Sequence, residues 1–301
     1  MKRSLIRGAD PQLALTIAER FAVAPRFVSV LARAKVWDEL PADVAARARE
    51  ICEQTHAANA ALLADLVSIA EALDAERLPY AATKGSAILV AHHSFVGERH
   101  LDDIDLLVRA TDLPRVDTLL TDLGATTERS PVNVDLHPLT VRTALGTKVE
   151  VHVRLPRGDQ AGVLDRATPT EWRTRRVRAE SSKDLINHLC HHVIAQHIED
   201  PRPLPRHLVD VAHLKSTCEP EMFDPRVPEV RLSLELLALI ERFQDDDRIE
   251  KLFASWLFPT HHSLIPSGIA SRRGAAEQGS RVRPPNWTRV RSGLVFRVAE
   301  F

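Results

Sequence analysis

Asp103 and Asp105 lie two residues apart in the run Asp103-Ile104-Asp105-Leu106-Leu107-Val108, and the other four residues of this run are apolar. The run predicts a β-strand, in which alternate side chains share a face, so both carboxylates project together while Ile104 and Leu106 point into the core. Two carboxylates about 6–7 Å apart along a strand suit Mg²⁺, which prefers oxygen ligands. We therefore expect a metal site on this strand, with Asp102 facing away as a solvated or capping residue.

A second predicted strand offers a third carboxylate. In Lys148-Val149-Glu150-Val151-His152-Val153, the polar residues Glu150 and His152 share one face and the valines share the other. If this strand neighbours the first, Glu150 is aimed at the two aspartates, and His152 lies beside the metal site or fills the polar face of the strand. Three carboxylates could hold two ions, one activating an acceptor hydroxyl and one holding a triphosphate, as two-metal phosphoryl transfer requires.

The segment Lys84-Gly85-Ser86 lies between a predicted strand at Tyr80–Thr83 and a predicted helix. Gly85 lets the backbone approach a phosphate, the Ser86 hydroxyl can donate to it, and the helix N-terminus favours its negative charge. Lys84 either contacts phosphate or is a surface lysine with a buried stem. Arg99 either pairs with a carboxylate to fix its loop or reaches a nucleotide phosphate, and we favour the first interpretation.

The elements around these residues predict an α+β protein in four parts. Residues 1–76 have apolar side chains at helical spacing, and residues 77–156 have short β-type runs with two helical patterns, one of them ending at Gly124. A capping box at Ser181-Ser182-Lys183-Asp184 opens a helix through about His197 in a helical region at 157–262. Residues 263–301 are rich in Arg, Pro, Gly and Ser, and we expect an irregular or disordered tail, with a short strand at 293–298. Further predicted elements are strands at 104–108, 132–136 and 149–153, and helices at 113–123, 208–214 and 232–243.

Composition limits the class of protein. The 301 residues carry 40 Lys plus Arg against 41 Asp plus Glu, a formal charge of -1 that argues against a dedicated nucleic-acid-binding domain. Three widely spaced cysteines suit a reducing compartment and form no CxxC metal motif. We find neither a signal-peptide pattern nor 18 consecutive apolar residues, so we expect a cytoplasmic protein that binds no membrane.

Four segments together resemble the bacterial family of uncharacterised nucleotidyltransferases, within the DNA polymerase β-like nucleotidyltransferase superfamily. They are Ala82-Thr83-Lys84-Gly85-Ser86-Ala87, Arg99 with Asp103–Val108, Val149-Glu150-Val151-His152, and Asp184-Leu185-Ile186-Asn187-His188-Leu189, and the similarity spans roughly residues 37–214. The resemblance implies a small polymerase β-like core, a mixed sheet with helices, flanked by N-terminal helices and a C-terminal helical region.

The resemblance also implies an activity. A nucleoside monophosphate would move from an NTP to an acceptor hydroxyl with release of pyrophosphate, using Mg²⁺, with two ions expected. Asp103, Asp105 and Glu150 would be the metal ligands and catalytic residues, and Gly85 and Ser86 the phosphate contacts. The remaining residues expected at the nucleotide site are Lys84, Arg99, His152 and His188, with His192 and Asp210 near substrate.

Other patterns have competing interpretations. Asp135 and His137 form a rival polar strand that we rank below Glu150, because Pro138 marks a strand end. His188 and His192 share a helix face and could bind zinc, but the Glu of an HExxH motif is missing, which favours a polar wall of the nucleotide site. The basic cluster Trp172–Arg178 binds RNA or is a solvated edge strand. Asp245-Asp246-Asp247 is interpreted as a solvated helix end or loop.

Two alternative functions follow from the same residues. One is a toxin of a toxin–antitoxin pair that modifies tRNA, which requires a basic cleft continuous with Trp172–Arg178. The other is a non-catalytic module of the same fold that binds a nucleotide or a partner. Nothing in the sequence identifies the acceptor among small molecules, peptides and RNA, or the oligomeric state.

Overall fold

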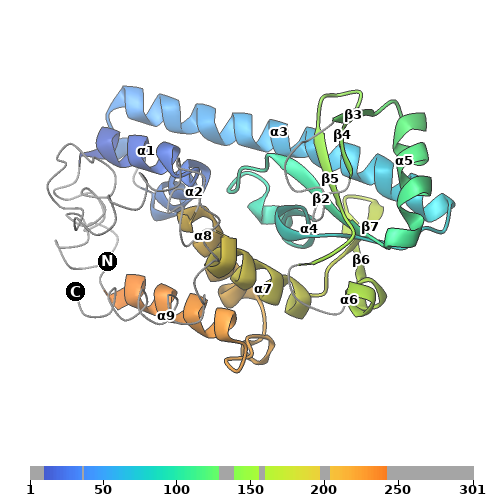
Figure 1. Ribbon diagram of the computed structural model, residues 1–301. Helices are drawn as coiled ribbons and strands as arrows, with labels where there is room; N and C mark the ends of the chain where they lie inside the picture. The colour runs from blue at the N-terminus through green and yellow to red at the C-terminus, as the bar shows by residue number, and fades with distance from the viewer. Residues whose placement is uncertain (1–9, 36, 129–138, 156–159, 197–203, 243–301) are drawn as a thin grey trace, which may run out of the picture. The chain divides into compact units, whose positions relative to one another are not determined.

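The computed structural model describes residues 10–35, 37–128, 139–155, 160–196 and 204–242 (Figure 1). The chain divides into two compact units, Met1–Asp245 and Asp246–Phe301. The second unit lies outside the described residues, and so do the predicted strands at 132–136 and 293–298, Asp135 and His137, the Asp245–Asp247 run and the expected tail at 263–301.

The N-terminal region consists of α1 (Pro11–Arg20), α2 (Ala24–Ala34), a 3-10 turn η1 (Trp37–Glu39) and α3 (Ala42–Ala75). Asp10 caps α1 by accepting a hydrogen bond from the backbone N–H of Gln12 at 2.9 Å, and Pro11 occupies the first helical position, where its missing N–H costs nothing. Leu15, Val28 and Val44 pack the three helices into a cluster of their own. The helical prediction for this region is confirmed.

α3 joins this region to the rest of the unit (Figure 1). It contacts α1 and α2 at its start and α5 and the sheet further along. Among the described helices it alone is long and apolar enough to span a membrane by those two criteria. Leu63, Leu66 and Leu73 on α3 are nevertheless fully buried in the main hydrophobic core, as expected for a core helix.

A seven-stranded mixed sheet forms the centre of the unit, in the order β3-β4-β5-β2-β1-β7-β6. β2 and β5 pair in parallel, as do β1 and β7, and the other pairs are antiparallel. The strands are β1 (Tyr80–Ala82), β2 (Asp103–Val108), β3 (Thr126–Glu128), β4 (Leu139–Arg142), β5 (Lys148–His152), β6 (Thr168–Trp172) and β7 (Arg175–Ala179). The α+β class is confirmed, but the sheet continues past residue 156, where the sequence predicts its end, because β7 pairs with β1.

The two faces of the sheet are covered by different helices. Ile104 and Leu106 join the main core with α3, α4 (Lys84–Ala91) and α5 (Leu113–Asp122), whereas Leu107 packs with α6 (Gln160–Arg166) on the other face. Because side chains alternate along a strand, Asp103 and Asp105 share the face of Leu107. The predicted separation of the aspartates from Ile104 and Leu106 is confirmed, and Leu107 is the apolar residue of β2 on the face of the aspartates.

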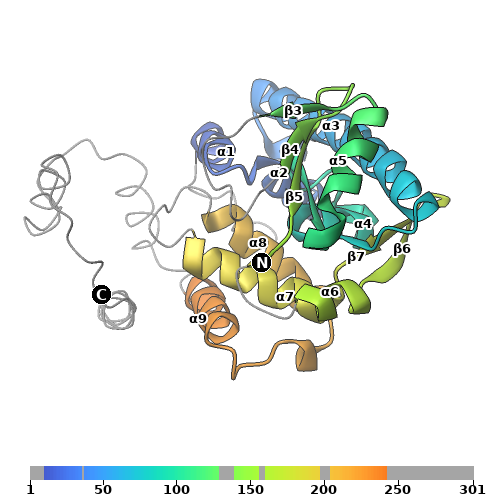
Figure 2. The same ribbon diagram turned by 45° about the vertical axis from the view of Figure 1, so that its right-hand side comes forward.

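The C-terminal helices pack against one another beside the sheet (Figure 2). They are α7 (Ser182–His191), the π-helical turn η4 (His192–Gln196), α8 (Leu204–Thr217) and α9 (Pro228–Arg242), with a 3-10 turn η5 (Pro220–Met222) between α8 and α9. The Ser181 side chain accepts a hydrogen bond from the backbone N–H of Asp184 at 3.3 Å, so the predicted helix start at Ser181 is confirmed. The Asp184 carboxylate accepts from the Ser181 hydroxyl at 2.6 Å. Two short 3-10 turns complete the described elements, η2 (His93–Phe95) and η3 (Ala110–Asp112).

Candidate active site

A cavity of about 250 Å³ lies where β2, β5 and the start of α4 face α7 and α8. Its lining includes four carboxylates and three cationic side chains, an unusually polar composition for a cleft of this size. The lining residues are Lys84, Gly85, Arg99, Leu101, Asp102, Asp103, Asp105, Glu150, Leu189, His192, Arg206 and His207. A larger groove of about 620 Å³ between α3 and α5 contains none of the residues predicted to do chemistry.

The strand register brings the predicted carboxylates together. Glu150 on β5 lies directly opposite Asp105 on β2 in the parallel pair, so the expectation that these strands are neighbours is confirmed. Ligand atoms of Asp105, Glu150 and His152 lie within 4.8 Å of one another. Asp103 is one step along the same face, opposite Lys148, and is not part of that tight group.

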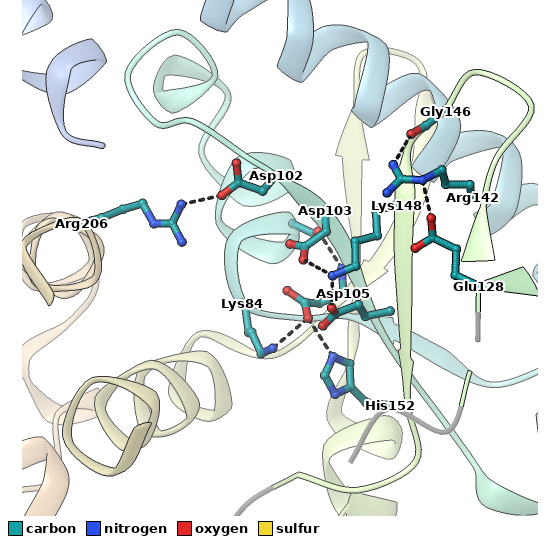
Figure 3. A network of polar contacts seen from close by, with 12 residues as sticks. Lys84, Asp102, Asp103, Asp105, Glu128, Arg142, Gly146, Lys148, His152 and Arg206 are labelled. Atoms are coloured by element: carbon teal, nitrogen blue, oxygen red, sulfur yellow. Dashed lines mark hydrogen bonds and ion pairs between the residues drawn. The ribbon is translucent and has the colours of Figure 1, made fainter. Parts of the chain in front are cut away.

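Asp105 is the most deeply buried of the three carboxylates. Its Oδ1 atom accepts a hydrogen bond from Lys84 Nζ at 2.8 Å and lies 2.7 Å from His152 Nε2 (Figure 3). Burial would raise the pKa of Asp105, but Lys84 and His152 outweigh it and hold the pKa far below its usual range. Asp105 is therefore an ionised carboxylate with a fixed orientation.

A second lysine lies between the other two carboxylates. Lys148 Nζ bonds to Glu150 Oε1. It is also 3.7 Å from Asp103 Oδ2 (Figure 3). Burial, together with the negative charges of Asp105 and Glu150, raises the pKa of Asp103 to about 6. The two ammonium groups thus reduce the repulsion within a crowded acidic cluster.

The Lys84-Gly85-Ser86 segment begins α4 beside this cluster. Lys84 has a left-handed backbone (φ 49°), which costs a non-glycine residue about 1 kcal/mol. Gly85 has no space for a side chain, because a Cβ atom there would lie 2.7 Å from Arg99 Cζ. Ser86 is fully buried, and its hydroxyl accepts a hydrogen bond from the backbone N–H of Asp105 at 3.2 Å. In this structure Ser86 positions β2 and does not line the cavity.

Arg99 connects the loop before β2 to α8. Its Nε atom lies 2.9 Å from Asp210 Oδ1, its second terminal nitrogen bonds to Asp210 Oδ2 at 3.1 Å, and its first donates to the His100 carbonyl at 3.0 Å. Arg99 and Asp210 are both buried. Of the two interpretations of Arg99, the pairing with a carboxylate is the one that the structure contains.

The same loop is held from the other side by Asn59 of α3, which the sequence gave no reason to select. The buried Asn59 amide donates to the carbonyls of Val96 and Arg99, each at 2.5 Å, and its oxygen accepts from the Leu101 N–H at 3.1 Å. These bonds lie directly before Asp102 and Asp103 in the chain. Asn59 therefore fixes the path by which the chain enters β2.

His188 lies outside the cavity, in contrast to His192. It is buried, and its Nδ1 atom is 3.0 Å from Oε1 of Glu180, a fully buried carboxylate that follows β7. Across the described residues, the one group of side chains close enough to share a metal ion is Asp105, Glu150 and His152. The zinc interpretation of His188 and His192 therefore gains no support.

The basic cluster at 172–178 is a β-hairpin at the sheet edge. Trp172 is only 9% exposed and contacts the His93 ring edge-on at 4.9 Å, so its ring is not available to stack on a base. Arg175 pairs with Glu71 on α3 at 2.7 Å. No residue of this cluster is among those that line the cavity, so nothing supports a basic cleft continuous with it. The arginines lie on β7, which pairs with both β1 and β6, so the prediction of an edge strand is wrong for them; the edge strand is β6.

No curated protein matches the chain. Among solved structures, the antibiotic-resistance factor ANT(2'')-Ia in solution shares 16% identity over 59% of this chain and 94% of that one, with a TM-score of 0.40. Crystalline ANT(2'')-Ia with adenylyl-2''-tobramycin shares 15% over 50% and 91%, with a TM-score of 0.35. An antigenic nucleotidyltransferase-like protein from Paracoccidioides brasiliensis shares 16% over 64% and 91%, with a TM-score of 0.42.

These structural similarities are too distant to indicate a substrate. The family comparison covers far more of the chain, because the model of the uncharacterised nucleotidyltransferases matches residues 7–240. The matched region contains every described helix and strand up to α9 and all the residues that line the cavity. The resemblance first seen in four short segments is thus confirmed over most of the sequence, and the chain belongs to the uncharacterised nucleotidyltransferase family.

Proposed function

We propose that this protein transfers a nucleoside monophosphate from an NTP to an acceptor hydroxyl in a Mg²⁺-dependent reaction that releases pyrophosphate. The observation that carries the proposal is the pairing of Asp105 with Glu150 on adjacent parallel strands, with Asp103 on the same face, in the wall of a polar cavity. Family membership supports the reaction class. The cytoplasmic location expected from composition belongs to the same proposal.

The donor atoms in the cluster fit the proposed metal. Asp103, Asp105 and Glu150 offer carboxylate oxygens, the ligands that Mg²⁺ prefers, and they are numerous enough for two ions. His152 would act behind them by orienting Asp105, to which it is hydrogen-bonded. When bound, Mg²⁺ would supply charge stabilisation to the phosphoryl oxygens and would increase the nucleophilicity of the acceptor oxygen.

The reaction itself needs positioning more than covalent chemistry. The acceptor oxygen forms a bond to the α-phosphorus as the bond to pyrophosphate breaks, and the hydroxyl proton passes to solvent. Lys84 and His152 keep Asp105 ionised and oriented. Asn59 and the Arg99–Asp210 pair keep the loop that leads to Asp103 in place, so the carboxylates need not reorganise during the reaction.

The nucleotide-binding residues divide into two groups. Lys84 and Gly85 line the cavity and are proposed to contact phosphate, as the sequence predicts. Ser86, Arg99 and His188 have protein partners that favour a positioning role. In this proposal α3 of the N-terminal region packs against the sheet, and the strands position the carboxylates. α7 and α8 form the wall of the cavity opposite the carboxylates.

The proposal is tested by incubating the protein with each labelled NTP, Mg²⁺ and a panel of RNA, protein and small-metabolite acceptors. We expect label on one acceptor class with release of pyrophosphate, and loss of both signals in EDTA. The Asp122→Asn variant is the control, because Asp122 is exposed at the end of α5, in the groove remote from the cavity. Transfer that persists in EDTA, or no pyrophosphate with any acceptor, would contradict the proposal.

A further inference from the structure

Arg206 of α8 lines the cavity and bonds to Asp102, the residue directly before β2 (Figure 3). Its first terminal nitrogen donates to Asp102 Oδ2 at 2.6 Å. The Arg206 side chain is 22% exposed, whereas Asp102 is 52% exposed. Asp102 also pairs with His100 Nε2 at 2.9 Å, so it keeps a partner if Arg206 moves away.

Arg206 differs from the other cations that line the cavity. Lys84 is engaged by the buried Asp105, and Arg99 uses its Nε and both terminal nitrogens on Asp210 and the His100 carbonyl. Arg206 Nε is buried and makes no hydrogen bond within the described part of the chain. An arginine has five N–H donors, and the bond to Asp102 uses one of them.

A polyphosphate that enters this cavity meets four carboxylates, those of Asp102, Asp103, Asp105 and Glu150. Bound Mg²⁺ would offset the charges of the last three. Asp102 faces away from that cluster and has Arg206 as its cation. The planar guanidinium group matches two phosphate oxygens, and it would gain a second acceptor by exchanging Asp102 for phosphate.

We propose that Arg206 binds the triphosphate of the nucleotide, and that Asp102 is the counter-ion that the phosphate displaces. This inference rests on the proposed function, since it names the residue that α8 contributes to the same site. Arg206 is not assigned by the sequence motifs, which end at the core and at α7. A second arginine–aspartate pair, Arg226 with Asp224 at 2.8 Å, lies outside the cavity and serves as the control.

The test measures binding of tripolyphosphate and of an α,β-methylene NTP to the full chain with Mg²⁺ by calorimetry. Loss of one charge-assisted contact predicts that Arg206→Met weakens both affinities by about 10–100-fold, with Arg206→Lys in between. Asp102→Asn is expected to tighten both by about 3–10-fold, since the competing acceptor loses its charge. Asp102→Asn should have no effect in the Arg206→Met background, and Arg226→Met and Asp224→Asn should bind like the wild type.

The opposite signs of the two variants separate ligand exchange from a merely structural ion pair. If Asp102→Asn weakens binding as much as Arg206→Met does, or if Arg206→Met binds like the wild type, the inference is wrong. Failure of the wild type to bind either ligand also overturns it. Nucleotide transfer with an unchanged KM in Arg206→Met would reject Arg206 alone, whereas Arg206-dependent tripolyphosphate binding without any transfer would reject the proposed function alone.

Discussion

At the scale of single residues, the acidic cluster is organised by two lysines. Lys84 engages Asp105, and Lys148 lies between Glu150 and Asp103. An ammonium group about 4 Å from a carboxylate stabilises it by up to about 4 kcal/mol near a protein surface. The lysines therefore stabilise the cluster in the absence of a divalent cation, and Lys148 also opposes the entry of one.

Replacing Lys148 by methionine tests this dual role. We expect Lys148→Met to lower the melting temperature in EDTA, because the positive charge of Lys148 no longer offsets the repulsion between Asp103 and Glu150. We also expect it to tighten Mn²⁺ binding by about 3–10-fold, measured by electron paramagnetic resonance titration.

The matched control for that measurement is Lys183→Met. Lys183 is exposed near the start of α7 and does not line the cavity. Mn²⁺ affinity that is unchanged or weaker in Lys148→Met would show that Lys148 does not compete with the cation.

At the scale of elements, the loop between α4 and β2 determines where Asp103 lies. Asn59 holds it from α3, and the Arg99–Asp210 pair ties it to α8. His213 of α8 adds a stacked contact on Phe95 of the loop, with ring centroids 4.0 Å apart. The loop is thus attached to both helical regions at points far apart in the sequence.

Asn59→Leu removes all three bonds from the α3 side. Because buried backbone groups are left without partners, we expect the free energy of unfolding to fall by about 2–4 kcal/mol in urea titrations. Gln54→Leu, on the exposed side of the same helix, should change it by less than about 0.5 kcal/mol. Equal stability of the Asn59 variant and the wild type would mean that the loop does not depend on Asn59.

His213 makes the attachment of α8 sensitive to pH. Burial lowers the pKa of His213 to about 4, with a further contribution from neighbouring positive charges. The titratable and charged groups that act on it are His92, Arg26 and Arg33, and both arginines pair with Glu98. In the unfolded chain histidine titrates near 6.5, so between about pH 6.5 and 4 the unfolded state binds more protons.

The stability contribution of neutral His213 is therefore complete above about pH 6.5 and falls as the pH decreases toward 4. We expect the unfolding free energy of the wild type to drop by about 2 kcal/mol more than that of His213→Gln between pH 7 and 4.5. The exposed His56→Gln serves as the control. If the unfolding free energies of the wild type and His213→Gln change in parallel with pH, His213 is not the cause of the loss of stability at low pH.

The sequence predicts the parts of the site that follow from local patterns. The alternation of β2 and β5 places Asp103, Asp105 and Glu150 on polar faces, and the strand register confirms the pairing. Asn59, Glu180 and Arg206 were missed because each is a single polar residue whose role depends on tertiary packing. The buried hydroxyl of Ser86 shows the same limit, since the motif predicts its position but not the strand that it contacts.

At the scale of the whole molecule, the site belongs to one unit. The family match ends at residue 240 and the first compact unit ends at Asp245, so the cavity and all its described walls lie within residues 10–242. We expect a chain ending at Asp245 to keep the melting temperature of the full chain. Calorimetry should give it a Mg²⁺–nucleotide affinity within about twofold of that of the full chain. A tenfold loss of affinity would assign part of the site to residues 246–301.

The central claim is that Asp105 and its neighbours transfer the nucleotidyl group and not the terminal phosphate. ATP labelled at the α-phosphate or at the γ-phosphate, supplied with Mg²⁺ and the acceptor found in the panel, distinguishes the two reactions. We predict that only the α label remains on the acceptor, that the γ label leaves as pyrophosphate, and that Asp105→Asn slows transfer by at least about 100-fold while Asp122→Asn does not. Transfer of the γ label, or transfer by Asp105→Asn at the wild-type rate, would contradict this claim.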